Sequence, residues 1–292
     1  MGCRPRWSAG DPVSRGRLVL VGTPIGNLDD LAPRAVAALA AADAVVCEDT
    51  RRTGRLLSHI GVRAPVLIVM NDHTESEVIA GILARLGRGE CVAVVSDAGM
   101  PGISDPGERL VAAAVAADHG VEVVPGPSAA ITALVGSGLP AGRFVFEGFL
   151  PRRGSGRSAR LRELAGERRT AVLYEAPHRI GRTLADLLEV CGPDRVVVLG
   201  RELTKLHEEF WRGTLAEAQQ HWSDHEPRGE FVIVLDGAPP PAEIDDDRIL
   251  AALVEARARG ASTRDAVDDV SEHLGVARRR VYALATGDGR GA

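Results

Sequence analysis

The chain has 292 residues, 45% of them hydrophobic and 26% charged, which is the composition of a globular protein with room for two ordinary domains and a small third. A formal net charge of −5 argues against a protein that coats nucleic acid, and 3% aromatic residues leave few rings on which single-stranded bases could stack. The four cysteines form no C-x-x-C pair, and no apolar run approaches the ~20 residues of a membrane span, so we expect a cytoplasmic, reducing location without a membrane partner.

Residues 1–16 include basic residues with no apolar stretch behind them, which predicts a disordered lead and not a signal peptide. The segment 17–140 then alternates strand-like and helical patterns. Its strand-like runs are short, rich in β-branched residues and without polar alternation: LVLVGTP, AVVCEDT, PVLIVMND, CVAVVSD and VEVVPGPS. Because a helical pattern follows each run, we predict an α/β domain whose parallel sheet is covered on both faces.

Residues 141–237 predict a second α/β domain. Its strand-like runs are RFVFEGFL, TAVLYEAP, RVVVLGREL, EFWRGTL and GEFVIVLDG. EFWRGTL follows RVVVLGREL too closely for a helical crossover, which predicts a mixed sheet. The segment APPPAE (238–243) is typical of a stiff linker, and the amphipathic patterns of 244–292 predict a small helical domain that resembles a helix-turn-helix.

The loop SDAGMPGISDPG (96–107) is the first candidate for a binding site, since it has three glycines and two prolines and follows the run CVAVV. Open α/β sheets bind ligands outside the carboxyl ends of their strands, and Gly99 allows a close main-chain approach that a Cβ would block. Asp97 can accept hydrogen bonds from a polar ligand or from the amides of the loop itself. We expect Ser104 or Asp105 to cap a helix that begins at Pro106.

Two further loops, GTPIGN (22–27) and PGPSAA (125–130), end the first and the fifth predicted strands. Ser128 lies at a helix start, where a hydroxyl and main-chain N–H groups are available to a ligand. Neither loop has the G-x-G-x-x-G pattern with an acidic residue ~20 positions further on, so a nicotinamide site is not expected. Three glycine-and-proline corners at one edge of one sheet predict a ligand site.

Charged residues follow several predicted strands. CEDTRRT (47–53) places Arg51 and Arg52 near this edge, with Asp49 able to act as a helix N-cap. YEAPHR (174–179) and RELTKLHEEF (201–210) supply the remaining candidates, which are Glu175, His178, Arg201, Glu202 and Lys205. Lys205 is the only lysine among 35 basic residues, and a structural role for His178 is the alternative reading. His207, Glu208 and Glu209 do not predict a metal site, because adjacent strand residues point to opposite faces.

These motifs occur in one order over residues 18–235, together with LVLVGTPIGNLDDLAPRA, FEGFLPRR and GEF. In this combination the chain resembles the ribosomal RNA small subunit methyltransferase I family. The resemblance implies the tetrapyrrole-methylase (class III methyltransferase) fold, in which two α/β domains hold S-adenosylmethionine between them, usually in a homodimer. It also implies methyl transfer to the ribose 2′-hydroxyl of a decoding-centre cytidine in the 16S rRNA of the small ribosomal subunit, and no metal.

The resemblance implies cofactor contacts at strand ends of both domains, namely Pro24, Asp97, Gly99, Ser128, Ala129, Tyr174, Ala176 and Gly229. A ribose hydroxyl is a poor nucleophile, so its proton must be removed or its developing negative charge stabilised. Our candidates are Glu202 or Glu175 as the base, His178 as a reserve base, and Lys205, Arg201 or Arg51 as the group that holds the negative charge.

RNA contacts are expected from the arginine-rich segment that follows the first strand of the second domain, at Arg152, Arg153, Arg157 and Arg160. The alternative for this segment is a solvated helix face. Two other functions remain open at this point: a class III methyltransferase that acts on a small tetrapyrrole or corrinoid, and a non-catalytic RNA-binding module.

Overall fold

The computed structural model describes residues 16–63, 66–71, 74–223, 227–240 and 244–287. The chain divides into two compact units, with the boundary in the sequence between Ala238 and Pro239. The predicted lead 1–16 lies outside the described residues except for Gly16, and so do residues 241–243 of the predicted linker.

Within the described residues, the first five strands form a parallel sheet in the order β3-β2-β4-β1-β5. The strands are β1 (Arg17–Val21), β2 (Ala44–Cys47), β3 (Leu67–Val69), β4 (Cys91–Val94) and β5 (Gly120–Val124). The predicted parallel sheet is confirmed. Because β1 lies between β4 and β5 and all three run the same way, their carboxyl ends share one edge of the sheet.

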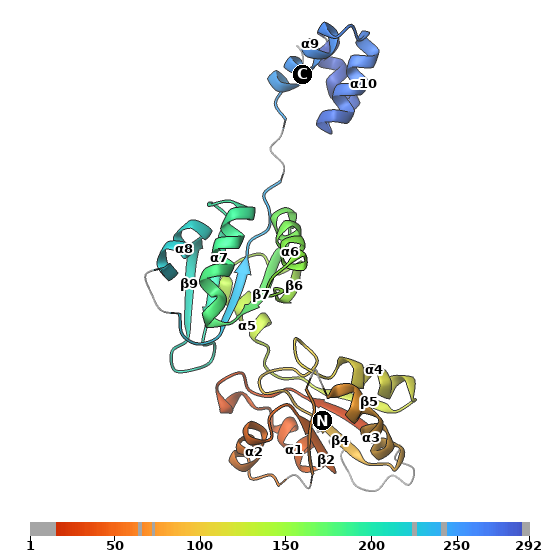
Figure 1. Cartoon of the computed structure of the whole chain (residues 1–292), viewed down its shortest axis with the longest axis vertical. Helices are drawn as coiled ribbons and strands as arrows, with labels where there is room; N and C mark the ends of the chain where they lie inside the picture. The colour runs from red at the N-terminus through yellow and green to blue at the C-terminus, as the bar shows by residue number, and fades with distance from the viewer. Residues whose placement is uncertain (1–15, 64–65, 72–73, 224–226, 241–243, 288–292) are drawn as a thin grey trace, which may run out of the picture. The chain divides into compact units, whose positions relative to one another are not determined.

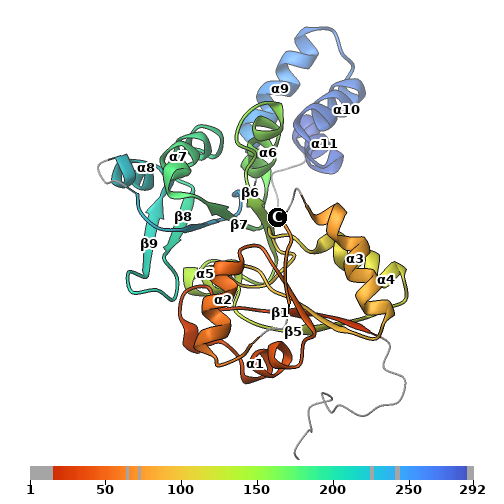
Figure 2. The same cartoon turned by 60° about the horizontal axis from the view of Figure 1, so that its bottom comes forward.

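Helices cover both faces of this sheet. A short 3-10 helix η1 (Leu28–Asp30) leads into α1 (Pro33–Ala40), which packs with α2 (Thr50–His59) on one face. On the other face α3 (Glu75–Gly87) and α4 (Glu108–Ala116) lie side by side, as Figures 1 and 2 show. Successive residues of the central strands β1, β2 and β4 serve opposite faces and are almost all buried, which explains why these strand sequences lack polar alternation.

The next five strands form a mixed sheet in the order β6-β7-β10-β8-β9 within the described residues. They are β6 (Phe144–Phe149), β7 (Thr170–Glu175), β8 (Val196–Arg201), β9 (Glu209–Thr214) and β10 (Phe231–Leu235). β6 and β7 are parallel, whereas β10 pairs antiparallel with both β7 and β8, and β8 pairs antiparallel with β9. The mixed sheet predicted from the short connection before EFWRGTL is confirmed.

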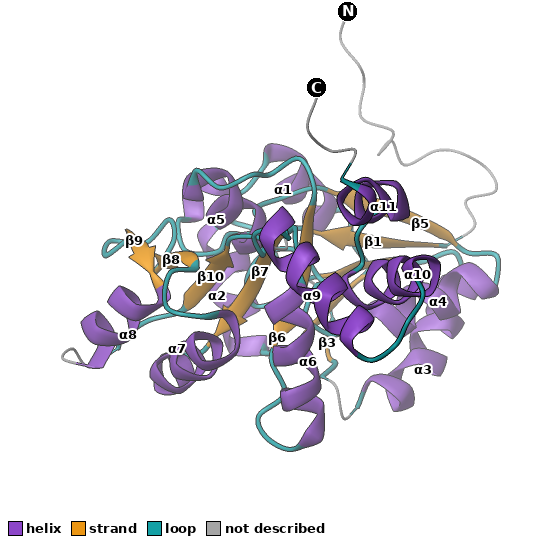
Figure 3. Ribbon diagram, turned by 90° about the horizontal axis from the view of Figure 1, so that it is seen from above, coloured by secondary structure: helices purple, strands orange, loops and turns teal. Residues whose placement is uncertain are grey.

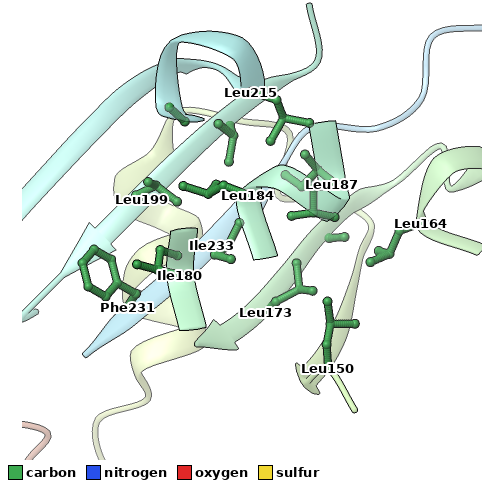
Figure 4. Packing of buried hydrophobic residues seen from close by; sticks show 14 of the residues in the cluster. Leu150, Leu164, Leu173, Ile180, Leu184, Leu187, Leu199, Leu215, Phe231 and Ile233 are labelled. Carbon is green, nitrogen blue, oxygen red and sulfur yellow. The ribbon is translucent and has the colours of Figure 1, made fainter. Parts of the chain in front are cut away.

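One face of the mixed sheet is covered by α6 (Ser155–Gly166), α7 (Pro177–Cys191) and α8 (Leu215–Ser223), of which α7 and α8 are neighbours in Figure 3. Figure 4 shows the apolar core that they share with the strands, in which leucines of α7 meet Leu199, Phe231 and Ile233. The other face packs against α5 (Ala129–Ser137), which follows β5 of the parallel sheet in sequence. Helix α5 thereby joins the loop edge of the first domain to the second domain.

The C-terminal unit consists of α9 (Asp246–Ala258), α10 (Thr263–Leu274) and α11 (Arg278–Thr286) around its own apolar core. Asp245 and Ser262 cap the first two helices by accepting main-chain hydrogen bonds, and Gly275 ends α10 in the left-handed conformation with a φ of 63°. The fold predicted from the sequence, with a parallel sheet, a mixed sheet and a helical C-terminus, is confirmed. No helix of the described residues is both long and apolar enough for a membrane crossing.

Candidate functional site

The three glycine-and-proline loops meet at the edge where β4, β1 and β5 end, as the sequence predicts. The main chain joins them directly: Thr23 N donates to Gly99 O (2.9 Å) and Gly99 N donates to Thr23 O (3.2 Å). Gly22 and Gly126 are in close contact, since a Cβ on Gly22 would lie 2.6 Å from the Gly126 Cα. Glycine is therefore required here by main-chain contact between two loops, and the loop edge is built largely of backbone.

The end of the long loop differs from our expectation. Helix α4 begins at Glu108 and not at Pro106, and its N-cap position is Gly107, so neither Ser104 nor Asp105 caps it. The carboxylate of Glu75 on α3 takes this role instead, because its Oε1 accepts from Gly107 N (3.2 Å) and Leu110 N (3.4 Å). A cap supplied from another helix lets residues 100–106 turn away from the helix axis.

A cavity of about 420 Å³ lies between the loop edge and the second domain; we call it the apolar cavity. Its volume falls within the range of roughly 300–1,000 Å³ that is usual for small-molecule sites. Residues of both domains line it, most of them apolar and the others polar or charged: Ile25, Ala98, Gly99, Met100, Ile103, Ser104, Asp105, Ser128, Ala129, Phe149, Tyr174, Glu175, Ala176, Pro177, His178, Leu203, Lys205, Glu230, Phe231 and Val232.

Tyr174 fixes the aromatic wall of the apolar cavity. Its hydroxyl accepts a hydrogen bond from Ala130 N (3.2 Å) in the first turn of α5. Its ring lies 5.6 Å from the Phe149 ring and 5.1 Å from the Phe146 ring, centroid to centroid. Burial raises the pKa of Tyr174, although hydrogen bonds to Ala130 and Ser128 oppose this shift, so the hydroxyl stays neutral.

A second cavity of about 290 Å³ adjoins the first; we call it the arginine cavity. It is lined by Thr23, Pro24, Ile25, Gly26, Leu28, Arg52, Thr53, Arg55, Leu56, Ser96, Asp97, Ala98, Lys205 and Glu230. Asp97 lies here, 3.5 Å from Arg52 Nε, and burial raises the pKa of its carboxyl against the opposing charge of Arg52. The cavities share Ile25, Ala98, Lys205 and Glu230, so they are adjacent.

Lys205 lies where the cavities join. Its Nζ donates to Glu202 Oε1 (2.7 Å) and to Glu230 Oε2 (3.0 Å). Burial alone would lower the pKa of Lys205, but these two carboxylates raise it, so the ammonium stays charged. Burial likewise opposes ionisation of Glu202, yet hydrogen bonds from Lys205 and from Glu230 N hold the pKa of Glu202 below its usual value. The site therefore presents a fixed cation next to an ionised carboxylate.

Glycines leave room for this charged group. A Cβ on Gly229 would lie 2.3 Å from Glu202 Cγ, and a Cβ on Gly26 would lie 2.4 Å from Lys205 Cγ. Asn27 N also donates to Thr204 Oγ1 (3.1 Å), so the first loop of the parallel sheet supports the Lys205 loop directly.

Glu175, the alternative candidate for the base, is fully engaged. Its side chain is buried, and it accepts from Ala176 N (2.9 Å) and Thr183 Oγ1 (2.6 Å) while Arg179 Nε lies 3.1 Å away. These contacts hold the carboxylate at the start of α7. His178, the reserve base, lines the apolar cavity on the same first turn.

The other sequence-predicted residues divide as follows. Gly99, Ser128, Ala129, Tyr174 and Ala176 line the apolar cavity, Pro24 and Asp97 line the arginine cavity, and Gly229 lines neither but lies against Glu202.

Two candidate arginines, Arg51 and Arg201, also line neither cavity. Arg51 is 85% exposed and bound to both carboxylate oxygens of Asp49, and Arg201 pairs with Glu209 at 3.0 Å. Placing Arg51 in the cleft was wrong, because the N-cap carboxylate of Asp49 holds it outside.

The arginine-rich segment also needs correction. Arg157 is buried, and its guanidinium binds Asp186 Oδ2 (2.7 Å), Thr183 Oγ1 (3.0 Å) and Pro151 O (3.1 Å), so it is not available to RNA. Arg160 is held by Glu147 (2.8 Å) and Glu163 (2.5 Å). Arg152 and Arg153 are exposed in the loop before α6.

Several lining residues were missed from the sequence. Arg55 reaches the arginine cavity from α2, and Ile25 separates the two cavities. Arg55 could have been found by helical spacing, because it follows Arg52 by three positions and so lies on the same face. No sequence pattern of this kind indicates that Phe149 lines the apolar cavity. The described residues contain no group of His, Cys, Asp and Glu side chains placed to hold a metal ion.

Comparison with known proteins identifies the family. Residues 17–219 match the tetrapyrrole (corrin/porphyrin) methylases. The ribosomal RNA small subunit methyltransferase I of Synechocystis sp. is 44% identical over 272 residues, which are 92% of this chain and 97% of that protein. The protein of the same name from Mycobacterium tuberculosis is 46% identical over 272 residues, 92% of this chain and 94% of its own.

Solved structures agree in fold. The methyltransferase CobJ superposes with a TM-score of 0.59 at 24% identity, covering 76% of this chain and 95% of its own. Uroporphyrin-III C-methyltransferase from Thermus thermophilus, complexed with S-adenosylhomocysteine, gives a TM-score of 0.53 at 21% identity, covering 76% and 97%. These likenesses show the fold, whereas the sequence relatives show the subfamily. The chain belongs to the ribosomal RNA small subunit methyltransferase I family of tetrapyrrole methylases.

Proposed function

We propose that this methyltransferase transfers a methyl group from S-adenosylmethionine to the ribose 2′-hydroxyl of a cytidine in 16S rRNA. The observation that supports the proposal is the position of Lys205, a residue that lines both the apolar cavity and the arginine cavity. A methyltransferase needs one place for the donor and one for the acceptor, with the reacting oxygen at their junction.

The apolar cavity fits S-adenosylmethionine, the methyl donor of this family. Its floor is main chain at Ala98 and Gly99, where a Cβ on Gly99 would lie 3.3 Å from both Ile25 Cγ2 and Pro127 O. Its walls are apolar and aromatic, and Ser128 at the start of α5 offers a hydroxyl. We propose that Gly99, Ser128, Ala129, Tyr174 and Ala176 hold the cofactor, with Pro24 and Asp97 at the side nearer the acceptor.

When bound, the cofactor supplies a methyl group that is attached to a positively charged sulfur. The acceptor oxygen displaces the sulfur from this methyl carbon: the O–C bond forms, the S–C bond breaks and the hydroxyl proton leaves. We propose that the Lys205 ammonium stabilises the negative charge that develops on the acceptor oxygen. Its raised pKa suits this role and rules Lys205 out as the base at neutral pH.

Glu202 is our proposed proton acceptor. Within the described residues, hydrogen bonds reach its Oε1 only, from Lys205 Nζ and Glu230 N, and Oε2 is left for the acceptor hydroxyl. Its lowered pKa keeps it ionised at the cost of basicity, so the Lys205 ammonium is needed to stabilise the negative charge on the acceptor oxygen as the proton leaves. His178 lines the apolar cavity and is the second candidate.

We further propose that Arg152 and Arg153 contact RNA phosphates, because both are exposed and neither takes part in an ion pair among the described residues. A homodimer is supported by Ile131 and Val135, which are one turn apart on α5 and 46% and 70% exposed. Sedimentation at several concentrations tests the dimer.

Labelled-methyl transfer to small ribosomal subunits from a strain that lacks this gene tests the function, followed by mapping of the modified nucleotide. We expect label on one cytidine ribose of 16S rRNA and none when the subunits are already modified. Transfer to a corrinoid and not to subunits would instead select the tetrapyrrole reading. Failure to bind S-adenosylmethionine in calorimetry would select a non-catalytic module.

A further inference from the structure

We propose that the arginine cavity is the acceptor subsite, and that Arg52 and Arg55 on α2 bind the phosphates on either side of the nucleotide that is methylated. The inference rests on the proposed function. It moves the principal RNA contact from the arginine-rich segment around α6 to one face of α2.

The two cavities are adjacent, and Lys205 and Glu230 line both of them, so a ligand in either cavity can contact these two side chains. In-line methyl transfer needs the attacking oxygen about 3–3.5 Å from the methyl carbon, on the far side from the sulfur. With the donor in the apolar cavity, an acceptor in the adjacent arginine cavity would lie next to it, at the residues that the two cavities share.

The charges of the arginine cavity are available to a ligand. Arg55 is exposed, and among the described residues it makes no hydrogen bond or ion pair. Arg52 is 63% exposed, and its contact with Asp97 is long, at 3.5 Å. By contrast, Arg51, Arg157 and Arg160 are each bound to carboxylates at 2.8 Å or less. In a chain with a net charge of −5, one unpaired and one loosely paired guanidinium group beside a cavity indicate an anionic ligand.

The spacing and size of the cavity favour a nucleotide in a strand. Arg52 and Arg55 are three positions apart on α2, so they lie on one helix face with their Cβ atoms about 5–6 Å apart. A volume of about 290 Å³ suits one nucleotide, whereas a tetrapyrrole macrocycle is much larger. Asp97 Oδ1 is buried without a partner among the described residues, so it can accept from a hydroxyl or amino group of the nucleotide.

The experiment measures binding of small subunits, taken from a strain lacking this gene, to the full-length protein across a salt series. Arg55→Ala and Arg52→Ala each weaken binding by roughly tenfold. Each also makes the negative slope of log K against log salt shallower by about 0.7–0.9, because one phosphate contact is lost. Arg55→Lys retains the charge, so the slope stays close to that of the unmodified protein.

Arg63→Ala is the matched control, because Arg63 is an exposed arginine just after α2 that lines neither cavity. It leaves affinity and slope unchanged. Calorimetry with S-adenosylmethionine gives the same affinity for all variants, which excludes misfolding and damage to the apolar cavity.

If Arg52→Ala and Arg55→Ala bind subunits with the affinity and slope of the unmodified protein, the acceptor subsite is elsewhere. The proposed function survives that result as long as the unmodified protein still methylates the subunits. If the unmodified protein does not methylate subunits at all, the proposed function itself fails.

Discussion

Lys205 Nζ lies 2.7 Å from Glu202 Oε1, and the short segment that joins the two residues has an unusual backbone. Glu202 and Thr204 both have positive φ values, 49° and 63°, which cost L-residues about 1–2 kcal/mol each. Hydrogen bonds offset this cost: Glu202 N donates to Glu230 O (3.0 Å) and Thr204 N donates to Glu208 Oε2 (2.6 Å). Strain of this kind, held by surrounding contacts, is typical of functional loops.

Replacing Lys205 with Met removes the cation while retaining a chain of similar length. We expect the single-turnover rate of methyl transfer at saturating subunits to fall by about 10²–10³, because the developing negative charge loses its stabilising partner. Lys205→Arg, which keeps a positive charge, should retain more activity. An affinity for S-adenosylmethionine equal to that of the unmodified protein would separate this effect from loss of the donor site. A rate within a few-fold of the original would exclude Lys205 from the reaction.

The same pair predicts a pH dependence of stability. The pKa of Glu202 is lowered in the folded protein from its usual 4.5, so its stabilising contribution is present above that pH and is lost as the pH falls through the folded value. The pKa of Lys205 is raised from 10.5, so its contribution is present below that pH and is lost only in strong alkali. We expect the difference in unfolding free energy between the unmodified protein and Lys205→Met to be constant from about pH 6 to 8 and to shrink below pH 4.5.

Urea denaturation at a series of pH values measures this difference. Arg63→Ala serves as the control, since Arg63 is remote from the Glu202 carboxylate in sequence and lines neither cavity. A difference that stays constant down to pH 3 would show that Lys205 does not stabilise the ionised form of Glu202.

Replacing Glu202 and Glu175 one at a time with Gln distinguishes a role in the reaction from a role in stability. Glu202→Gln removes the proposed base, so we expect the single-turnover rate to fall by about 10²–10⁴, with a stability change of at most about 1 kcal/mol because the pair is partly exposed. Glu175→Gln removes a buried charge that pairs with Arg179, so we expect a loss of about 1–3 kcal/mol in stability with a rate near the original. The reverse pattern would assign the base to Glu175.

The sequence predicted the loop edge well and the individual arginines poorly, for a physical reason. Parallel strands must end at the same edge, so Gly99 and Ser128 could be placed together once their strands were recognised. Whether an arginine is available depends on partners remote in sequence. Arg157 binds Asp186, which lies 29 positions further on, and no local pattern indicates that contact. The N-cap of α4 was mistaken for the same reason, since it comes from Glu75 on another helix.

Gly229 is predicted to be required for the position of Glu202. Gly229→Ala would be strained at a φ of 84°, and its Cβ would lie 2.3 Å from Glu202 Cγ. We expect a stability loss of about 1–2 kcal/mol and a large loss of methyl transfer. Gly138→Ala is the matched control, because Gly138 has a φ of 80° but nothing within 4 Å of the added Cβ. Equal stability losses with full activity in both variants would show that Glu202 can move without consequence.

Substitution of Arg157 should affect stability and not RNA binding, whereas substitution of Arg152 and Arg153 should affect RNA binding and not stability. Arg157→Ala leaves Asp186 without its main partner in a largely buried position, so we expect stability to fall by about 2–4 kcal/mol in urea denaturation.

Substituting Arg152 and Arg153 with Ala together should change stability by less than about 0.5 kcal/mol, since both side chains are exposed. If they contact phosphates, the salt slope of subunit binding falls by about 1.4–1.8 for the double variant. Arg157→Ala, studied at a temperature where it remains folded, should leave that slope unchanged, because the Arg157 guanidinium is buried against Asp186 and Thr183 and does not reach RNA. A reduced slope for Arg157→Ala would mean that α6 rearranges on the subunit and releases this arginine.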